Sequence, residues 1–187
     1  MLGTLGYPVS PDALRKGLSK TVWPGRLTCL TRNPLFLIDG AHNEAAAKKL
    51  RESLEAYFPG RRFIYIMGVF KDKEYEKIAG IMAPLARSVH TVSLPDTART
   101  LPAEELAGVM KRYCAAEDPI PAQNCMGSAI QDTNVPVRAE ASIEIAVKHA
   151  FAEANKTDII LAFGSLSYLG QVMRIHEDIR TQYINEI

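Results

Sequence analysis

The 187-residue sequence lacks the features that would direct it to an oxidising compartment, a membrane or a nucleic acid. Its three cysteines are widely spaced and favour neither a disulfide framework nor a zinc site: Cys29, Cys114 and Cys125. It has no apolar run long enough to span a bilayer and no signal-peptide core at its N-terminus. The net charge of +1 gives no electrostatic reason to expect nucleic acid or an anionic membrane as a partner. We therefore expect a cytoplasmic protein.

Several motifs of nucleotide and ester chemistry are also absent. There is no G-x-x-x-x-G-K-[ST] phosphate loop, and no G-x-G-x-x-G turn follows any predicted strand. The G-x-S-x-G elbow of α/β hydrolases is missing as well. The histidines show no ligand spacing, so no metal site is expected among His42, His90, His149 and His176.

The residues that are present predict a single α/β domain. With 47% hydrophobic and 23% charged residues, the chain can build a substantial core. Strands are predicted at 27–31, 35–39, 63–69, 89–94, 124–130 and 158–163. Helical periodicity appears in 43–58, 74–86, 102–115, 138–154 and 168–184, with Pro102 and Pro136 placed to start helices. Alternating strands and helices predict a mostly parallel sheet of about six strands, and strands apolar throughout are typical of sheets covered on both faces.

The first 22 residues differ from the rest. Ser10 is a good N-cap and Pro11 suits the first helical position, so a short helix is expected there. That helix offers only Ala13, Leu14 and Leu18 to a core, which is too little for independent stability. We expect it to pack on sequence outside this chain.

The most informative stretch is residues 35–43, where an apolar strand ends in Asp39, a glycine turn follows, and a helix opens near His42. Ligands of open α/β sheets bind beyond the carboxyl ends of the strands, and a helix N-terminus there attracts anions. Asp39 is therefore a candidate acceptor for hydroxyl hydrogens and His42 a candidate phosphate contact. The alternatives are that Asp39 only caps the helix and that His42 is a polar surface residue. Asn43 is expected to cap the helix.

Together these motifs resemble the folylpolyglutamate synthase/dihydrofolate synthase family, a branch of the Mur ligase superfamily. The resemblance rests on the following residues in order: Trp23-Pro-Gly-Arg26, Asp39-Gly-Ala-His-Asn43, Gly68, Lys71-Asp-Lys73, Arg99, Gly164-Ser-Leu166 and Gly170. Two features depart from the family pattern. Its N-terminal domain, with the phosphate loop and magnesium ligands, has no counterpart here, and the last turn reads Ser165-Leu-Ser-Tyr168 where the family more often has Tyr directly after Leu.

The resemblance implies a Rossmann-like domain of the Mur ligase C-terminal type over 23–187, preceded in 1–22 by the tail of an ATPase domain and a linker. It implies an ATP-dependent ligase that phosphorylates a carboxylate of folate or dihydropteroate and joins it to L-glutamate. ATP and Mg²⁺ are the implied cofactors, with the magnesium ligands in the N-terminal domain. This chain alone is then expected to be inactive, and the full enzyme monomeric.

The resemblance also implies roles for individual residues. Arg26 is similar to the family's ATP-binding arginine, and Asp39 to its nucleotide-contacting carboxylate. His42 would contact phosphate or lie near the nucleotide, or else form a fixed hydrogen bond within its own turn. The remaining candidates would line the glutamate site or cleft, the alternative being ordinary solvated side chains: Lys71, Asp72, Lys73, Arg99 and Ser165. Tyr168 is expected to pack rather than to act in chemistry.

Two other functions stay open at this point. One is a stand-alone nucleotide-binding or regulatory module that uses the crevice beside Asp39 without chemistry. The other is the corresponding domain of a peptidoglycan Mur ligase, which Gly40 and the Trp23–Arg26 turn fit less well.

Overall fold

The computed structural model describes residues 6, 9–21, 23–115 and 135–185, with side chains as far as Thr181. The elements in chain order are α1 (Pro11–Lys20), β1 (Thr28–Arg32), β2 (Leu35–Ile38), α2 (Glu44–Tyr57), β3 (Phe63–Met67), α3 (Tyr75–Met82), the 3₁₀ turn η2 (Ala83–Leu85), β4 (Ala86–Val92), α4 (Ala103–Ala115), β5 (Val137–Glu140), α5 (Ile143–Glu153), β6 (Ile159–Phe163) and α6 (Leu166–Asn185).

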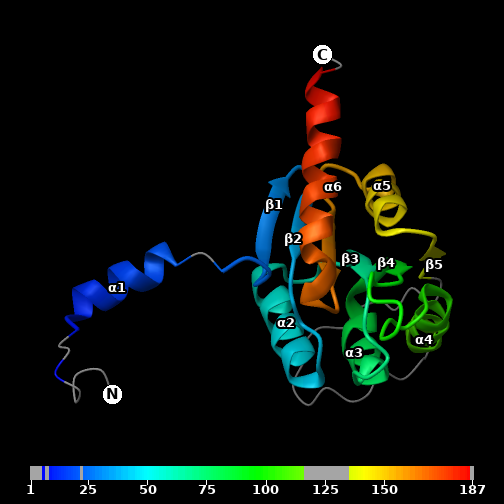
Figure 1. The fold of residues 1–187 in the computed structure, drawn as a ribbon, viewed down its shortest axis with the longest axis horizontal. Helices are drawn as coiled ribbons and strands as arrows, with labels where there is room; N and C mark the ends of the chain where they lie inside the picture. The colour runs from blue at the N-terminus through cyan, green and yellow to red at the C-terminus, as the bar shows by residue number, and fades with distance from the viewer. Residues whose placement is uncertain (1–5, 7–8, 22, 116–134, 186–187) are drawn as a thin grey trace.

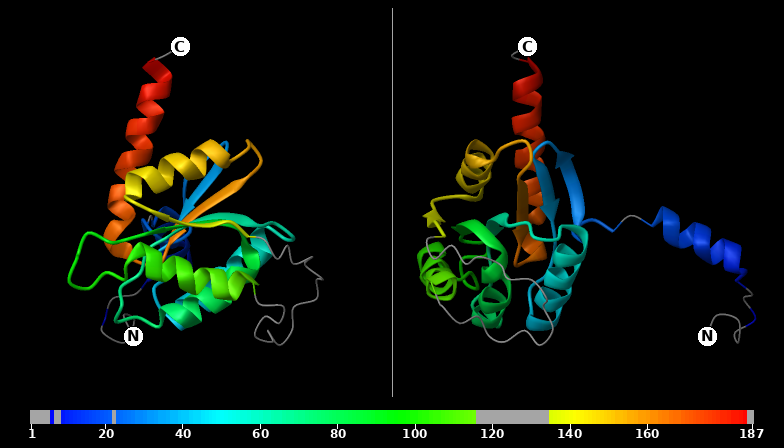
Figure 2. Two further views of the ribbon diagram at one scale, coloured as in Figure 1. Left: turned by 90° about the vertical axis from the view of Figure 1, so that its right-hand side faces the viewer. Right: turned by 180° about the vertical axis from the view of Figure 1, so that it is seen from behind.

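The strands form one sheet in the order β1-β2-β6-β3-β4-β5, between two layers of helices (Figure 1). Only the β1–β2 pair is antiparallel, and the other four pairs are parallel. Helices α2, α3 and α4 cover one face, while α5 and α6 cover the other (Figure 2). The predicted mostly parallel sheet with helices on both faces is confirmed.

The alternation of side chains along the central strands builds both cores. In β3, Phe63, Tyr65 and Met67 pack into the cluster beneath α2, α3 and α4. Ile64 and Ile66 point the other way, into the cluster beneath α5 and α6. All five are fully buried, because successive strand residues face opposite sides and both sides carry helices.

The prediction of a helix over 138–154 is wrong at its start. Val137–Glu140 forms the edge strand β5, and the Pro136 carbonyl accepts the backbone N–H of Val89 at 2.8 Å. Pro136 therefore hydrogen-bonds to the sheet immediately before β5 and does not start a helix. Helix α5 begins later because the Ser142 side chain accepts the N–H of Ile145 and caps it.

The boundary after α3 also differs from the prediction of a helix over 74–86. The α-helix ends at Met82, a 3₁₀ turn containing Pro84 follows, and β4 already begins at Ala86. Proline cannot donate a helical hydrogen bond, which explains the early end. The strand predicted at 124–130 lies outside the described residues.

Helix α1 extends away from the sheet and its helices (Figure 1). The Ser10 side chain accepts the Ala13 N–H and Pro11 opens the helix, as predicted. None of its residues is buried, and Leu14 and Leu18 are 56% and 68% exposed. Across the described residues, no helix has both the length and the apolar character that a membrane span requires.

Candidate functional site

Three of the predicted motifs meet at the carboxyl end of β2. The Gly25 carbonyl, in the turn before β1, accepts the backbone N–H of Gly40 at 2.7 Å. A Cβ at Gly40 would lie 2.4 Å from Leu166 Cδ2, and one at Gly25 would lie 2.9 Å from the same atom. The first residue of α6 therefore packs directly on both glycines, and a larger residue at Gly40 would displace it.

Asp39 is fixed by two backbone donors. Its Oδ2 accepts the N–H of Leu27 at 2.7 Å, and its Oδ1 accepts the N–H of Ala41 at 2.8 Å. The helix cap is Asn43, whose Oδ1 accepts the N–H of Ala46 at 2.9 Å. The alternative role of Asp39 as the cap of α2 is therefore wrong, and the expectation for Asn43 is confirmed.

His42 is half-buried and takes part in the turn between β2 and α2. Its Nδ1 lies 2.8 Å from the carbonyl oxygen of Gly40, so that nitrogen carries the proton. This is the hydrogen bond within the turn that the sequence left as an alternative for His42. It fixes the ring orientation and leaves Nε2 as the nitrogen available to a ligand.

Lysine and arginine side chains gather around Asp72 beyond the end of β3. Arg99 Nη2 lies 3.3 and 3.1 Å from the two carboxylate oxygens of Asp72, and Lys73 Nζ lies 3.2 Å from one of them. Partial burial acts to raise the pKa of Asp72, but the hydrogen bonds from Lys73 and Arg99 outweigh it and lower this pKa. The Arg99 guanidinium also lies over Phe70, with Cζ 4.4 Å from the ring centre.

The two loops that carry these residues are tied together by their backbones. The N–H of Lys71 donates to the carbonyl of Arg99 at 2.9 Å, and Phe70 forms an isolated antiparallel bridge with Thr100. Lys71 itself is exposed. The loops therefore position Arg99 beside Asp72 although 27 residues separate them in sequence.

Ser165 lies at the start of α6, where β3 and β6 end side by side. Gly164 has φ of +114°, and a Cβ there would lie 2.4 Å from the Gly68 carbonyl oxygen. Ser165 is buried; its hydroxyl accepts the Ser167 N–H at 3.2 Å and lies 2.9 Å from the Ser167 hydroxyl. It therefore acts as the N-cap of a helix whose positive end faces the carboxyl edge of the sheet.

A cavity of about 240 Å³ unites part of the predicted set. Four predicted site residues line it: His42, Lys73, Arg99 and Ser165. The other four do not line it: Arg26, Asp39, Lys71 and Asp72. Three lining residues were not predicted as site residues: Phe70, Leu166 and Ser167. Their apolar or small side chains carry no signal that would separate them from core or loop residues.

Arg26 does not line the cavity, but the preceding residue, Gly25, packs against Leu166, which does. It is exposed, and its Cζ lies 6.0 Å from the ring centre of Trp23, which is 67% exposed. The peptide that follows Arg26 donates the hydrogen bond to Asp39. The Trp23–Arg26 turn therefore presents an unburied guanidinium and indole beside Asp39, which follows β2 directly.

A six-stranded, mostly parallel sheet with a basic cavity at the carboxyl ends of its strands has the layout of a ligand-binding α/β domain. The family model "Mur ligase, glutamate ligase domain" matches residues 25–166. The chain belongs to this family.

The relatives specify the branch that the motifs resemble. The dihydrofolate synthase/folylpolyglutamate synthase of Bacillus subtilis is 34% identical over 113 residues, covering 59% of this chain and 26% of the relative. The structure of E. coli FolC in complex with ADP has a TM-score of 0.77 at 22% identity and covers 96% of this chain. A bifunctional folylpolyglutamate synthase/dihydrofolate synthase with Mn, AMPPNP and L-glutamate bound has a TM-score of 0.73 at 23% identity and covers 94% of this chain.

This chain is much shorter than these proteins. It spans 26% of the Bacillus relative and 38% of each of the two solved chains. The similarity to folate-glutamate ligases that the sequence motifs indicate is confirmed, and it concerns one part of those enzymes.

Proposed function

We propose that this domain forms part of the active site of an ATP-dependent ligase that adds L-glutamate to folate or dihydropteroate through an acyl phosphate. The observation that carries the proposal is the cavity in which Lys73, Arg99 and the first turn of α6 lie next to His42. Membership of the glutamate ligase domain family supports the same assignment.

The cavity suits a carboxylate of the incoming glutamate. Lys73 and Arg99 supply two cationic groups, and the N-terminus of α6 adds the positive end of a 20-residue helix. Asp72 holds both cations from outside the cavity, which restricts their rotamers before a ligand arrives. At 240 Å³ the cavity is small for a complete substrate set, which agrees with a site that a second domain completes.

The ATP side of the site is assigned to Arg26, Asp39 and His42. Each carboxylate oxygen of Asp39 accepts one backbone N–H and keeps a second lone pair for a ribose hydroxyl. The exposed guanidinium of Arg26 matches phosphoryl oxygens, whose charge grows as the acyl phosphate forms. His42 would approach the phosphates through Nε2.

ATP and a divalent metal ion are the proposed cofactors, with Mg²⁺ as the physiological ion. Among the residues that the structure describes, no carboxylate lines the cavity, and Mg²⁺ prefers carboxylate and water oxygens. The cavity therefore does not fit the ion, and its ligands are assigned to the ATP-binding domain. We propose that the ATP-binding domain closes over the cavity, aligns the substrates and excludes water. The complete enzyme is proposed to be a monomer.

A cytoplasmic location fits this assignment. Cys29 and Cys114 are both free thiols, and Cys29 is exposed. Exposed free thiols are typical of a reducing compartment.

The test is glutamate-dependent ADP formation when the chain is mixed with an ATP-binding domain of the same family, ATP, Mg²⁺ and a folate substrate. Arg99→Ala and Lys73→Ala should each raise the KM for glutamate by about tenfold or more with a smaller effect on kcat, because a charge-assisted hydrogen bond contributes about 1.5–3 kcal/mol. Arg112→Ala is the matched control, since Arg112 is exposed and pairs with Glu76 on α3. Well-folded components that release no ADP in response to glutamate would contradict the ligase assignment.

A further inference from the structure

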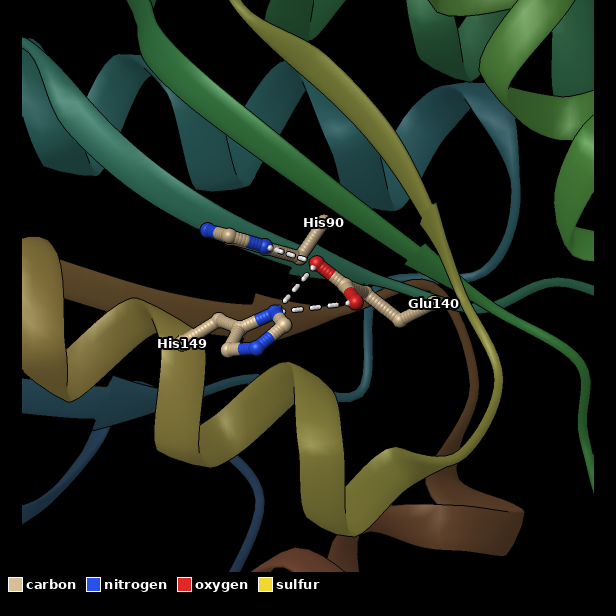
Figure 3. Close-up of side chains that lie close together, drawn as sticks. All are labelled: His90, Glu140 and His149. Atoms are coloured by element: carbon tan, nitrogen blue, oxygen red, sulfur yellow. Dashed lines mark hydrogen bonds and ion pairs between the residues drawn. The ribbon is translucent and has the colours of Figure 1, made fainter.

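A second group of titratable side chains lies at the edge of the sheet and takes no part in the proposed ligase site. His90 on β4, Glu140 on β5 and His149 on α5 converge so that the two imidazoles flank one carboxylate (Figure 3). His90 Nδ1 lies 2.7 Å from Glu140 Oε1, and His149 Nδ1 lies 3.1 and 3.0 Å from the two carboxylate oxygens. None of the three lines the cavity described above.

The buried ring of His90 has acceptors on both sides. Its Nε2 lies 3.2 Å from Glu153 Oε1, while its Nδ1 faces Glu140. A neutral imidazole carries only one proton, so one of these two contacts joins two lone pairs. At 1% exposure no water can relieve that contact. A metal ion at Nδ1 would remove this conflict, because it accepts the lone pairs of both Nδ1 and the Glu140 oxygen.

The donor atoms are those of a zinc site. Nδ1 of His90, Nδ1 of His149 and a carboxylate oxygen of Glu140 all lie within 4.8 Å of one another. Two imidazole nitrogens and one carboxylate are a common donor set for Zn²⁺, whose ligands lie about 2.0–2.2 Å from the metal. We propose that His90, Glu140 and His149 bind Zn²⁺.

A carboxylate at the other ring nitrogen of His90 supports the tautomer that a metal at Nδ1 needs. With the proton of His90 on Nε2 and donated to Glu153, the Nδ1 lone pair faces Glu140 and His149. Glu153 is in turn fixed by the Ser88 hydroxyl and by Arg138 Nη1 at 3.3 Å. Metal-bound histidines in proteins usually donate their other ring nitrogen to a carboxylate in this way.

The site is open on one side, because the His149 side chain is 52% exposed. Zn²⁺ can therefore enter from solvent, and water would complete its fourth position. The ligands come from β4, from the edge strand β5 and from α5 on one face of the sheet. The bound ion would fasten the edge strand and α5 to the sheet and thereby stabilise the fold.

The experiment uses the whole chain, without an affinity tag, after treatment with a chelator. Calorimetric titration with ZnCl₂ near neutral pH should show one equivalent bound with a dissociation constant of about 1 μM or tighter. Zn²⁺ should raise Tm, because it binds the folded state. Co²⁺ in place of Zn²⁺ should give the visible absorption of a low-symmetry four-coordinate site.

His149→Ala removes an exposed ligand without opening the core, and the affinity of this variant for Zn²⁺ should be lower by at least about 100-fold. Glu153→Gln changes a residue that holds a ligand and is not a ligand itself, so its affinity should fall by only about 10–100-fold. Glu140→Gln should also abolish tight binding. The matched controls are His42→Ala, which removes a half-buried histidine outside this group, and Glu144→Gln, which changes an exposed glutamate of α5, the helix that carries His149. Both should bind Zn²⁺ like the unmodified chain.

Two results would overturn the proposal. One is a dissociation constant weaker than about 100 μM in the unmodified chain, which would leave the three side chains as a hydrogen-bonded group without a metal. The other is equal loss of affinity in His149→Ala and His42→Ala, which would show only non-specific binding to surface histidines.

Discussion

The carboxylate of Asp39 accepts the backbone N–H of Leu27 at 2.7 Å, across twelve positions of sequence. Leu27 has φ of +41°, a left-handed conformation that costs a non-glycine residue about 1 kcal/mol. The hydrogen bond holds it there and joins the Trp23–Arg26 turn to the end of β2. Asp39 is therefore a structural residue of the site, whatever ligand it also contacts.

Asp39→Asn should lower the free energy of unfolding by about 1–3 kcal/mol, because the amide has one acceptor oxygen where the carboxylate has two. Urea denaturation measures the change. Asp12→Asn, at an exposed position of α1, should shift stability by no more than about 0.5 kcal/mol. Equal stability of the two variants would show that the hydrogen bonds to Asp39 contribute little.

Gly164→Ala should destabilise the protein by about 2 kcal/mol or more. A methyl group there would lie 2.4 Å from the Gly68 carbonyl oxygen, and φ of +114° is strained for any L side chain. Gly108→Ala in α4 is the control, since a Cβ at Gly108 meets nothing within 4 Å. It should raise stability by up to about 1 kcal/mol through helix propensity, so thermal unfolding should move the two variants in opposite directions.

Tyr168→Phe should cost about 1–2 kcal/mol although it changes a single oxygen. The phenol is fully buried, and its oxygen lies 2.9 and 2.8 Å from the carbonyl oxygens of Ile66 and Phe163, at the ends of β3 and β6. Burial raises the pKa of this phenol, so it stays a neutral donor. Tyr57→Phe, at a residue 71% exposed, should leave the urea midpoint nearly unchanged. A similar small effect at both positions would contradict the role given to the Tyr168 hydroxyl.

The acid dependence of stability should include a contribution from Glu44. Hydrogen bonds and ion pairs with Lys48 and Lys77 lower the pKa of Glu44 to about 2 from an ordinary 4.5. Because the pKa is lower in the folded state, this stabilisation is complete above pH 4.5 and is lost as the pH falls toward 2.

Glu44→Gln cannot ionise, so its urea midpoint should fall less steeply than that of the unmodified chain between pH 4.5 and pH 2. Lys77→Met removes one partner, 2.9 Å from Glu44 and on the neighbouring helix, and should remove part of the same dependence. Parallel curves for all three proteins would show that these exposed pairs do not couple to folding.

ATP should bind the isolated chain weakly or not measurably, because we assign the main grip on the phosphates to another domain. Calorimetry with ATP and Mg²⁺ tests this directly. A micromolar dissociation constant would favour the alternative of a stand-alone nucleotide-binding module, particularly if no ligase activity appears in the reconstituted mixture.

Much of the fold could be predicted from local patterns. The strands through Phe63–Met67 and Ile159–Phe163 are continuous apolar runs, and such runs are typical of strands buried on both faces. The error at Val137–Glu140 arose because four residues carry too little periodicity to outweigh a preceding proline. Their pairing with β4, which no local pattern reveals, makes them a strand.

Sequence alone thus determined the class of fold, the helix caps at Ser10 and Asn43, and the family, because these depend on neighbouring residues and on motif spacing. Only the tertiary structure decided which distant side chains share space: Arg99 with Asp72, Asp39 with Leu27, and His90 with His149. The physical reason is that such contacts follow from strand order and helix packing. The same spatial arrangement can be reached with many different separations along the sequence, so the separation of two residues does not reveal their contact. Four isolated histidines in the sequence gave no metal motif, yet the order of β4, β5 and α5 brings two of them to one carboxylate.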